Sequence, residues 1–163
     1  MIEYMQRTRD YYASLGYPTY RWAQHPADLF TRLAQTLARS KLALITTAAP
    51  VQPSAGDQGP GAAYNGAAKF FEVYQRPISP VPDLRISHIA YDRAQCAADD
   101  ANTWLPIAAL VDAVTDGLVG ELAPELIGVP TNRSQRITEA QDAPAAFNAC
   151  VEQEVQAALL VPT

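Results

Sequence analysis

The sequence contains little of the material from which metal sites and disulfide frameworks are built: two cysteines and two histidines among 163 residues. A metal site needs three or four converging ligands, and His25 lies far along the chain from His88, so we predict no metal site. We expect Cys96 and Cys150 to be free thiols, because two cysteines without an export signal are more typical of a reduced than of a bridged pair.

Clusters of basic residues and long apolar runs are also missing. Lys and Arg number 12 against 17 Asp and Glu, the formal net charge is −5, and no basic run exceeds two residues. This charge pattern excludes a nucleic-acid surface, whose affinity depends on clustered cations facing phosphates. No apolar stretch approaches the roughly 20 residues that span a bilayer. The amino terminus carries charges throughout, unlike a secretory signal, so we expect a cytoplasmic protein without nucleic-acid or membrane partners.

The length and apolar content predict one domain over residues 1–163, whose first 40 residues form a helical arm. We expect helices over residues 2–15 and 25–40, because apolar residues recur there at helical spacing. The aromatic residues of the arm predict a surface that packs on the domain or on a second subunit. They are Tyr11, Tyr12, Tyr17, Tyr20 and Trp22.

Residues 48–68 are dense in Gly, Pro and Ala and predict a loop that is mobile and closes over a ligand. Its segment GDQGPG resembles a phosphate-binding loop, but the spacing fits neither glycine-rich fingerprint and no Lys-Ser/Thr pair follows.

The remaining segments alternate between strands and helices. Strands are expected over residues 41–47, 69–78, 83–92 and 157–161, and helices over residues 105–117 and 142–155. Asp142 is expected to cap the last helix, whose buried stripe would be Phe147, Cys150, Val151 and Val155. The order of these elements predicts an α/β three-layer sandwich with a short, mostly parallel sheet.

Chemistry-bearing residues gather after the strand that begins at residue 83. His88 and Asp92 could form an acid–base pair near the carboxyl end of a strand, or His88 could simply bond to backbone. Tyr91 and Asp92 could equally form a turn, because Asp readily caps its own backbone. A two-thiol mechanism through Cys96 and Cys150 is disfavoured, because acidic neighbours would raise the pKa of Cys96 and Cys150 lies on an apolar stripe.

One region resembles a known family. DLRISHIAYD, followed by ANTWLPIAALVDAVTDGLVGELAP, is similar to the selenoprotein B subunit of the glycine/sarcosine/betaine/D-proline reductases and to its short bacterial relatives. The matching residues are Ser87, His88, Tyr91, Asp92, Asn102, Pro106, Leu110, Gly117, Gly120, Glu121 and Leu122. KLALITT and AALLVPT also resemble family strands, so that the resemblance covers residues 40–163 apart from the loop at 48–68.

The resemblance implies a component of a selenol- or thiol-dependent reductase that cleaves a carbon–heteroatom bond in a small substrate. It implies His88, Tyr91 and Asp92 as catalytic residues, with Ser87, Asn102 and Glu121 binding substrate. It implies no organic cofactor, but a thiol reductant or redox partner protein. The family's histidine- and aromatic-containing segment after GELAP is replaced by ELIGVPTNRSQR, and its Gly-Gly pair by Ala48-Ala49. Because both changes border the expected substrate site, the family's substrates are not carried over.

In the family, the strand resembling AALLVP leads to a selenocysteine or cysteine, two residues and a cysteine, whereas this sequence stops at Thr163. A stop codon read in place of selenocysteine, a deliberate truncation and a split protein all remain open. The alternative function is a non-catalytic ligand-binding or partner subunit whose redox half is another chain. In each case we expect a homodimer or a complex with a companion chain, formed by the face beside the last strand.

Overall fold

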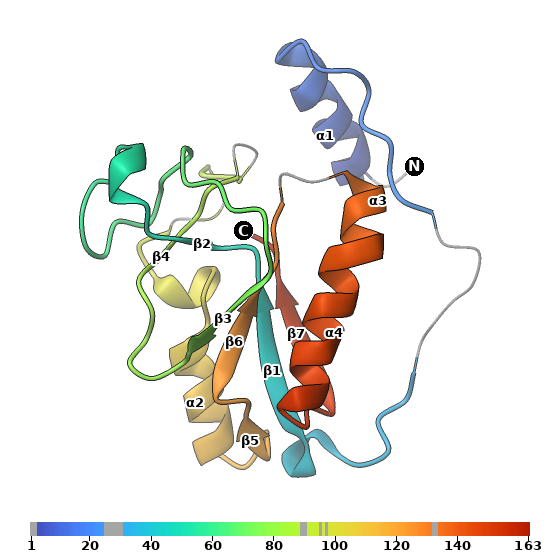
Figure 1. Cartoon of the computed structure of the whole chain (residues 1–163), viewed down its shortest axis with the longest axis vertical. Helices are drawn as coiled ribbons and strands as arrows, with labels where there is room; N and C mark the ends of the chain where they lie inside the picture. Colours follow the sequence, from blue (N-terminus) through green and yellow to red (C-terminus); the bar gives the residue numbers. More distant parts are fainter. Residues whose placement is uncertain (1–2, 25–30, 89–90, 95, 97, 132–133) are drawn as a thin grey trace. The chain divides into compact units, whose positions relative to one another are not determined.

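We describe the chain from a computed structural model that defines residues 3–24, 31–88, 91–94, 96, 98–131 and 134–163. These residues belong to two compact units, Met1–Thr31 and Arg32–Thr163, which are described separately. Figure 1 shows the helices α1 (Glu3–Ser14), α2 (Ile107–Thr115), α3 (Gln135–Ile137) and α4 (Ala143–Glu152), and the strands β1 (Lys41–Thr46), β2 (Ala49–Pro50), β3 (Tyr74–Pro77), β4 (Leu84–Arg85), β5 (Glu121–Leu122), β6 (Glu125–Gly128) and β7 (Ala157–Val161).

The first unit consists of α1 and a segment whose aromatic rings contact one another. The predicted first helix is confirmed, and Gly16 follows its end with a φ of 77°. The ring centroids of Tyr12 and Tyr20 are 5.6 Å apart, and those of Tyr20 and Trp22 are 4.9 Å apart. Since α1 buries no residue, these ring contacts are the main packing within the unit. The expected docking of this arm on another surface stays a prediction.

The second unit is an α/β fold built on a mostly parallel sheet, as the sequence predicts (Figure 1). β1 is central and pairs in parallel with β7 over its whole length, Leu42 opposite Ala157 through Thr46 opposite Val161. On its other side β1 pairs in parallel first with β5 and then with β6. β3 joins β6 antiparallel and forms the edge opposite β7. Within the described residues, β7 therefore has a free outer edge.

Helices cover the two faces of this sheet and make three layers. Leu44 and Leu126 face α2, where they share a core with Ile107 and Leu110. Ile45 and Ile127, the next residue in each strand, face α4 and its buried Ala146 and Ala149. Neighbouring residues of a strand point to opposite faces, so the near-continuous apolar sequence of β1 supplies both cores.

Two glycines shape the segment after α2. The helix expected over residues 105–117 forms but is shorter, since it follows Pro106 and ends at Thr115. Gly117 has a φ of 72°, a left-handed conformation that suits glycine at a helix end. Gly120 lies against the backbone before β1, where an added Cβ would be 2.8 Å from the carbonyl oxygen of Ser40. Any side chain at Gly120 would push β5 away from β1.

The predicted helix over residues 25–40 is wrong for its described part. Residues 25–30 lie outside the described residues, and residues 31–40 contain only a 3-10 turn at Leu37–Arg39. Leu33 and Leu37, whose spacing suggested a helix, are exposed. Apolar spacing stabilises a helix mainly through the surface it packs on, and the described residues leave Leu33 46% and Leu37 39% exposed.

The last helix forms, but its predicted cap and buried stripe are partly wrong. The helical segment starts earlier, at Ser134, whose hydroxyl accepts from the Ile137 amide, and it runs through a π-helical turn at Thr138–Asp142. Asp142 therefore lies inside the segment and makes no capping hydrogen bond. Phe147 and Val151 are exposed, by 67% and 58%, and the small side chains of Ala146 and Ala149 are buried instead.

Candidate functional site

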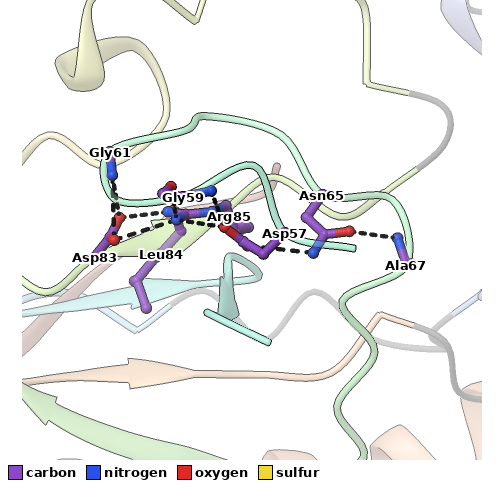
Figure 2. Close-up of polar contacts among 8 residues, drawn as sticks. All are labelled: Asp57, Gly59, Gly61, Asn65, Ala67, Asp83, Leu84 and Arg85. Carbon is purple, nitrogen blue, oxygen red and sulfur yellow. Dashed lines mark hydrogen bonds and ion pairs between the residues drawn. The ribbon is translucent and has the colours of Figure 1, made fainter. Parts of the chain in front are cut away.

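Among the described residues of the second unit, the most buried charged side chain is that of Arg85 in β4, which is 0% exposed and whose contacts are drawn in Figure 2. Its Nε lies 2.9 Å from Oδ2 of Asp57, and one terminal nitrogen lies 3.0 Å from Oδ1 of the same residue. Its other terminal nitrogen bonds to Asp83, and the carbonyl oxygen of Gly59 also accepts from Arg85. Two carboxylates and two backbone carbonyls, those of Gly59 and Leu84, thus surround one guanidinium.

These contacts fix the charge state of the cluster. Hydrogen bonds from Arg85 lower the pKa of the Asp57 and Asp83 carboxyl groups, and both carboxylates raise the pKa of Arg85. All three groups are charged at neutral pH. Because the carboxylates and carbonyls accept from the guanidinium, Arg85 has no donor left for a phosphate. The GDQGPG segment instead bonds the carboxylates, since the Gly61 amide donates to Asp83 and the Gly59 amide donates to Asp57.

The Arg85 cluster joins the loop at 48–68 to β4. Asn65 extends it, since its side chain donates to Asp57 and accepts from the Ala67 amide. The strands expected over residues 69–78 and 83–92 are shorter than predicted. They are β3, Tyr74–Pro77, and β4, Leu84–Arg85, which pairs with β2, Arg85 opposite Ala49. The loop is therefore anchored by contacts that its composition does not predict.

Ser87 and His88 follow β4 directly. Ser87 is 1% exposed and its hydroxyl has no hydrogen-bond partner among the described residues. The ammonium of Lys69 reaches the carbonyl oxygen of Ser87 at 3.4 Å. His88 is half-buried, and burial lowers its pKa, with a smaller contribution from the positive charge of Lys69. A neutral imidazole beside a cation is the resulting state at neutral pH.

Tyr91 and Asp92 form a turn, which is one of the two interpretations that the sequence leaves open. The Tyr91 amide donates to the carbonyl oxygen of His88 at 3.3 Å, and Oδ1 of Asp92 accepts from the Ala94 amide at 3.0 Å. The Tyr91 ring packs edge-on against Tyr64 at 6.0 Å, and burial raises the pKa of its hydroxyl. Tyr91 is therefore a protonated hydroxyl in this part of the fold.

Asn102 holds the start of α2. Its side-chain oxygen accepts from the Ala109 amide at 3.1 Å, and its own amide donates to Asp100 at 2.9 Å. Helix starts leave backbone amides unsatisfied, and Asn is a preferred residue for bonding them. The structure thus gives Asn102 a helix-capping contact in place of a free amide group.

Glu121 lies apart from the other predicted residues. It sits in β5 opposite Lys41, the first residue of β1, and its carboxylate lies 2.9 Å from the Lys41 ammonium. Its side chain is 60% exposed. The segment from Ser87 to Asp92 instead follows β4, whose partner β2 begins beyond the carboxyl end of β1. The structure brings Ser87, His88, Tyr91 and Asp92 together and leaves Glu121 at the opposite end of β1.

The carboxyl end of β1 carries a second polar contact. The Thr163 amide donates to Oγ1 of Thr47 at 2.7 Å, and the two hydroxyls are 3.1 Å apart. Thr47 precedes β2 by two residues, and Ser87 follows Arg85 by two. Since Ala49 pairs antiparallel with Arg85, the residues before Ala49 lie on the same side of this pair as the residues after Arg85. We call Thr47, Lys69, Ser87, His88 and Thr163 the carboxyl-end residues.

The thiols lie in different places. Cys96 is exposed and its amide donates to the carbonyl oxygen of Asp92, whereas Cys150 lies on α4, where burial raises its pKa. Within the described part of the chain, no three His, Cys, Asp or Glu side chains are arranged to hold a metal ion. No helix among the described residues has the length and apolar content needed to cross a membrane.

Comparisons of the chain with protein-family models, with curated proteins and with solved structures return no match. The resemblance to the reductase family therefore rests on the motifs quoted from the sequence.

Two contacts in this region could not be predicted from the sequence. Lys69 was assigned only to a strand, and nothing in its neighbourhood signals that it meets Ser87, 18 residues later. The sequence predicts only that Arg85 lies in a strand, whereas its burial depends on Asp57, 28 residues earlier. The one available signal was an Asp within a Gly-rich loop that lacks large apolar residues.

Proposed function

We propose that this protein is a component of a selenol- or thiol-dependent reductase that cleaves a carbon–heteroatom bond in a small substrate. The observation that supports the proposal most is the position of His88. It follows β4, whose partner β2 begins just past the carboxyl end of β1, and it is half-buried with a lowered pKa. Ligands of open α/β sheets bind at this end.

The proposed chemistry needs a selenolate or thiolate near the carboxyl end of β7, supplied by this chain or by a companion chain. That group attacks the substrate carbon and displaces the heteroatom group, which takes up a proton, so that a selenoether or thioether forms. A second thiolate then attacks the selenium or sulfur of this adduct. A selenenyl sulfide or disulfide forms between the two redox groups, and the reduced carbon is released and takes up a proton. Selenol is favoured because an ordinary thiol, with a pKa of about 8.5, is mostly protonated at neutral pH. A dithiol reductant or a redox partner restores the pair.

His88 has a defined part in this proposal. A neutral imidazole has one N–H to donate and one nitrogen that accepts. It can therefore orient a substrate or take the proton of the attacking thiol, whereas an imidazolium would be needed to protonate a leaving group. Tyr91 and Asp92 shape this turn, and Asn102 acts by holding α2. We place the protein in the cytoplasm, where such thiols stay reduced.

The test compares two forms of the chain with dithiothreitol and small amine, sarcosine-like or betaine-like substrates. Release of the amine is expected only when a Cys-x-x-Cys segment is joined after Thr163, and not from the 163-residue form. In the extended form, His88→Gln is expected to lower kcat about 10²-fold, a usual contribution of a general acid or base. His25→Gln is the matched control and should leave kcat unchanged.

Turnover by the 163-residue form would contradict the placement of the redox pair after Thr163 and would implicate Cys96 or Cys150. The separate variants Cys96→Ser and Cys150→Ser would then show which thiol is needed.

The second candidate is a non-catalytic ligand-binding or partner subunit. It is favoured by the raised pKa of Cys150, which makes the one half-buried thiol a poor nucleophile. Substrate binding by calorimetry without turnover in either form would support that alternative.

A further inference from the structure

Helix α4 lies beside β7 in the second unit (Figure 1), and side chains of the two elements line an apolar groove without charged residues. We call it the α4–β7 groove. It encloses about 470 Å³, and its lining includes Ile45, Ala146, Phe147, Cys150, Ala158 and Leu160. Phe147 and Leu160 remain 67% and 68% exposed. The only charged residue of α4 is Glu152, its last, and β7 has none. Exposed apolar patches of this kind mark interaction surfaces.

The groove borders a strand edge that is able to pair. β7 bonds β1 on one side, and its sequence Ala-Ala-Leu-Leu-Val contains no lysine, proline or bulge of the kind that protects free edges. The carbonyls of Leu42 and Thr46 accept from Ala123 and Val129, on the side of β1 away from β7. Because the backbone groups of successive strand residues point to opposite edges, those of Ala43 and Ile45 point toward β7. In a parallel pair each such residue bonds the two neighbours of its partner, and the partners here are Ala158 and Leu160. The backbone groups of Ala158 and Leu160 are thus directed to the free edge.

We propose that a second copy of this chain occupies the groove, by antiparallel pairing of β7 with β7 about a two-fold axis at Leu159. Ala158 of each copy then forms a hydrogen-bonded pair with Leu160 of the other. Both side chains lie on the α4 face. The two-fold axis therefore places the large Leu160 side chain of each copy against the small Ala158 side chain of the other. A two-fold contact uses the same patch on both subunits and removes both free edges at once.

Charge favours this occupant and this direction. The chain has a net charge of −5, so that copies repel each other unless their contact avoids acidic residues. Residues 155–163 carry no charged side chain. In the antiparallel register, Glu154 of the two copies lies beyond opposite ends of the paired strands, so that the two carboxylates are kept apart. A parallel pairing would place these carboxylates side by side.

Light scattering of the full chain over a range of micromolar concentrations tests the assembly. We expect twice the mass of one chain. Leu160→Lys should reduce the mass to that of one chain, because it places an ammonium against the partner's Ala158. Leu118→Lys is the matched control, since Leu118 is 64% exposed and lies after α2; it should leave the dimer intact. A wild-type monomer, or a dimer that survives Leu160→Lys, would overturn the proposal.

A crosslink tests the register. In a Cys96→Ser, Cys150→Ser background, Leu159→Cys should form an intermolecular disulfide on mild oxidation, because non-hydrogen-bonded pairs have Cα atoms about 4.5 Å apart. Val161→Cys is the control: its two copies would lie about 13 Å apart, beyond disulfide reach. Equal crosslinking at both positions, or none at residue 159, would overturn the stated register.

Discussion

Two regions of the second unit reverse the usual division between inside and outside. Arg85 is a charged residue with a side chain that is 0% exposed, and Leu160 is an apolar residue that is 68% exposed. Arg85 can be buried because carboxylates and carbonyls satisfy its donors, whereas the described residues leave the Leu160 side chain, on the strand with the free edge, mostly uncovered. The comparison shows that burial in this fold follows from the available partners and not from the class of side chain.

Removal of the buried Arg85 cation should have the largest effect on stability among the changes to these two regions. Arg85→Met leaves Asp57, whose side chain is 2% exposed, as an uncompensated buried carboxylate. Breaking a buried ion pair from one side usually costs about 3–5 kcal/mol. We expect a loss of that size in the free energy of unfolding, measured by urea denaturation.

The exposed ion pair provides the control. Glu121→Gln removes one partner of the Lys41–Glu121 pair, whose carboxylate side chain is 60% exposed, and should not change the urea midpoint measurably. It should also leave substrate binding unchanged, in contrast to the substrate-binding role that the resemblance implies. Equal midpoints for Arg85→Met and the wild type would show that the cluster contributes nothing net.

Acid should weaken the same cluster more gradually. Arg85 holds the folded-state pKa of Asp57 and Asp83 below the ordinary value of 3.8. A lowered folded pKa means that the stabilisation is complete above that ordinary value and is lost as pH falls through the folded pKa. We therefore expect the stability difference between wild type and Arg85→Met to narrow below about pH 4. Unfolding midpoints measured from pH 7 downward check this, and a constant difference would contradict it.

The smallest expected effect is local and concerns the loop at 48–68. The amides of Gly59 and Gly61 donate to Asp57 and Asp83, so we expect their hydrogen exchange to be slow without ligand and faster in Arg85→Met. Fast exchange across residues 56–66 in the wild type would instead support the mobile lid that the composition predicts. Mass spectrometry of peptides from this loop distinguishes the two.

The elements predicted correctly are those whose sequence alone carries the physical cause. β1 and β7 are short apolar runs, and α2 has Pro106 before its start and Gly117 after its end. The α/β class follows from their order. For residues 31–40, helical spacing misled because the described residues leave Leu33 and Leu37 exposed. Phe147 misled because α4 meets the sheet through alanines.

The candidate site was predictable only as a stretch of chain. His88, Tyr91 and Asp92 are close in sequence, so their proximity is a local property, and the Asp92 turn follows from its own chemistry. Lys69 beside Ser87 and Asp57 beside Arg85 are long-range contacts set by the pairing of β2 with β4. No spacing rule gives the partner of a two-residue strand.

The close approach of Gly120 to Ser40 bears on how relatives of this chain should be recognised. Gly117 ends α2, Gly120 admits the backbone before β1, and Glu121 pairs with exposed Lys41. The Gly-x-x-Gly-Glu-Leu part of the motif is thus accounted for by chain geometry alone. A search pattern built on it would collect proteins that share this turn, whatever reaction they catalyse.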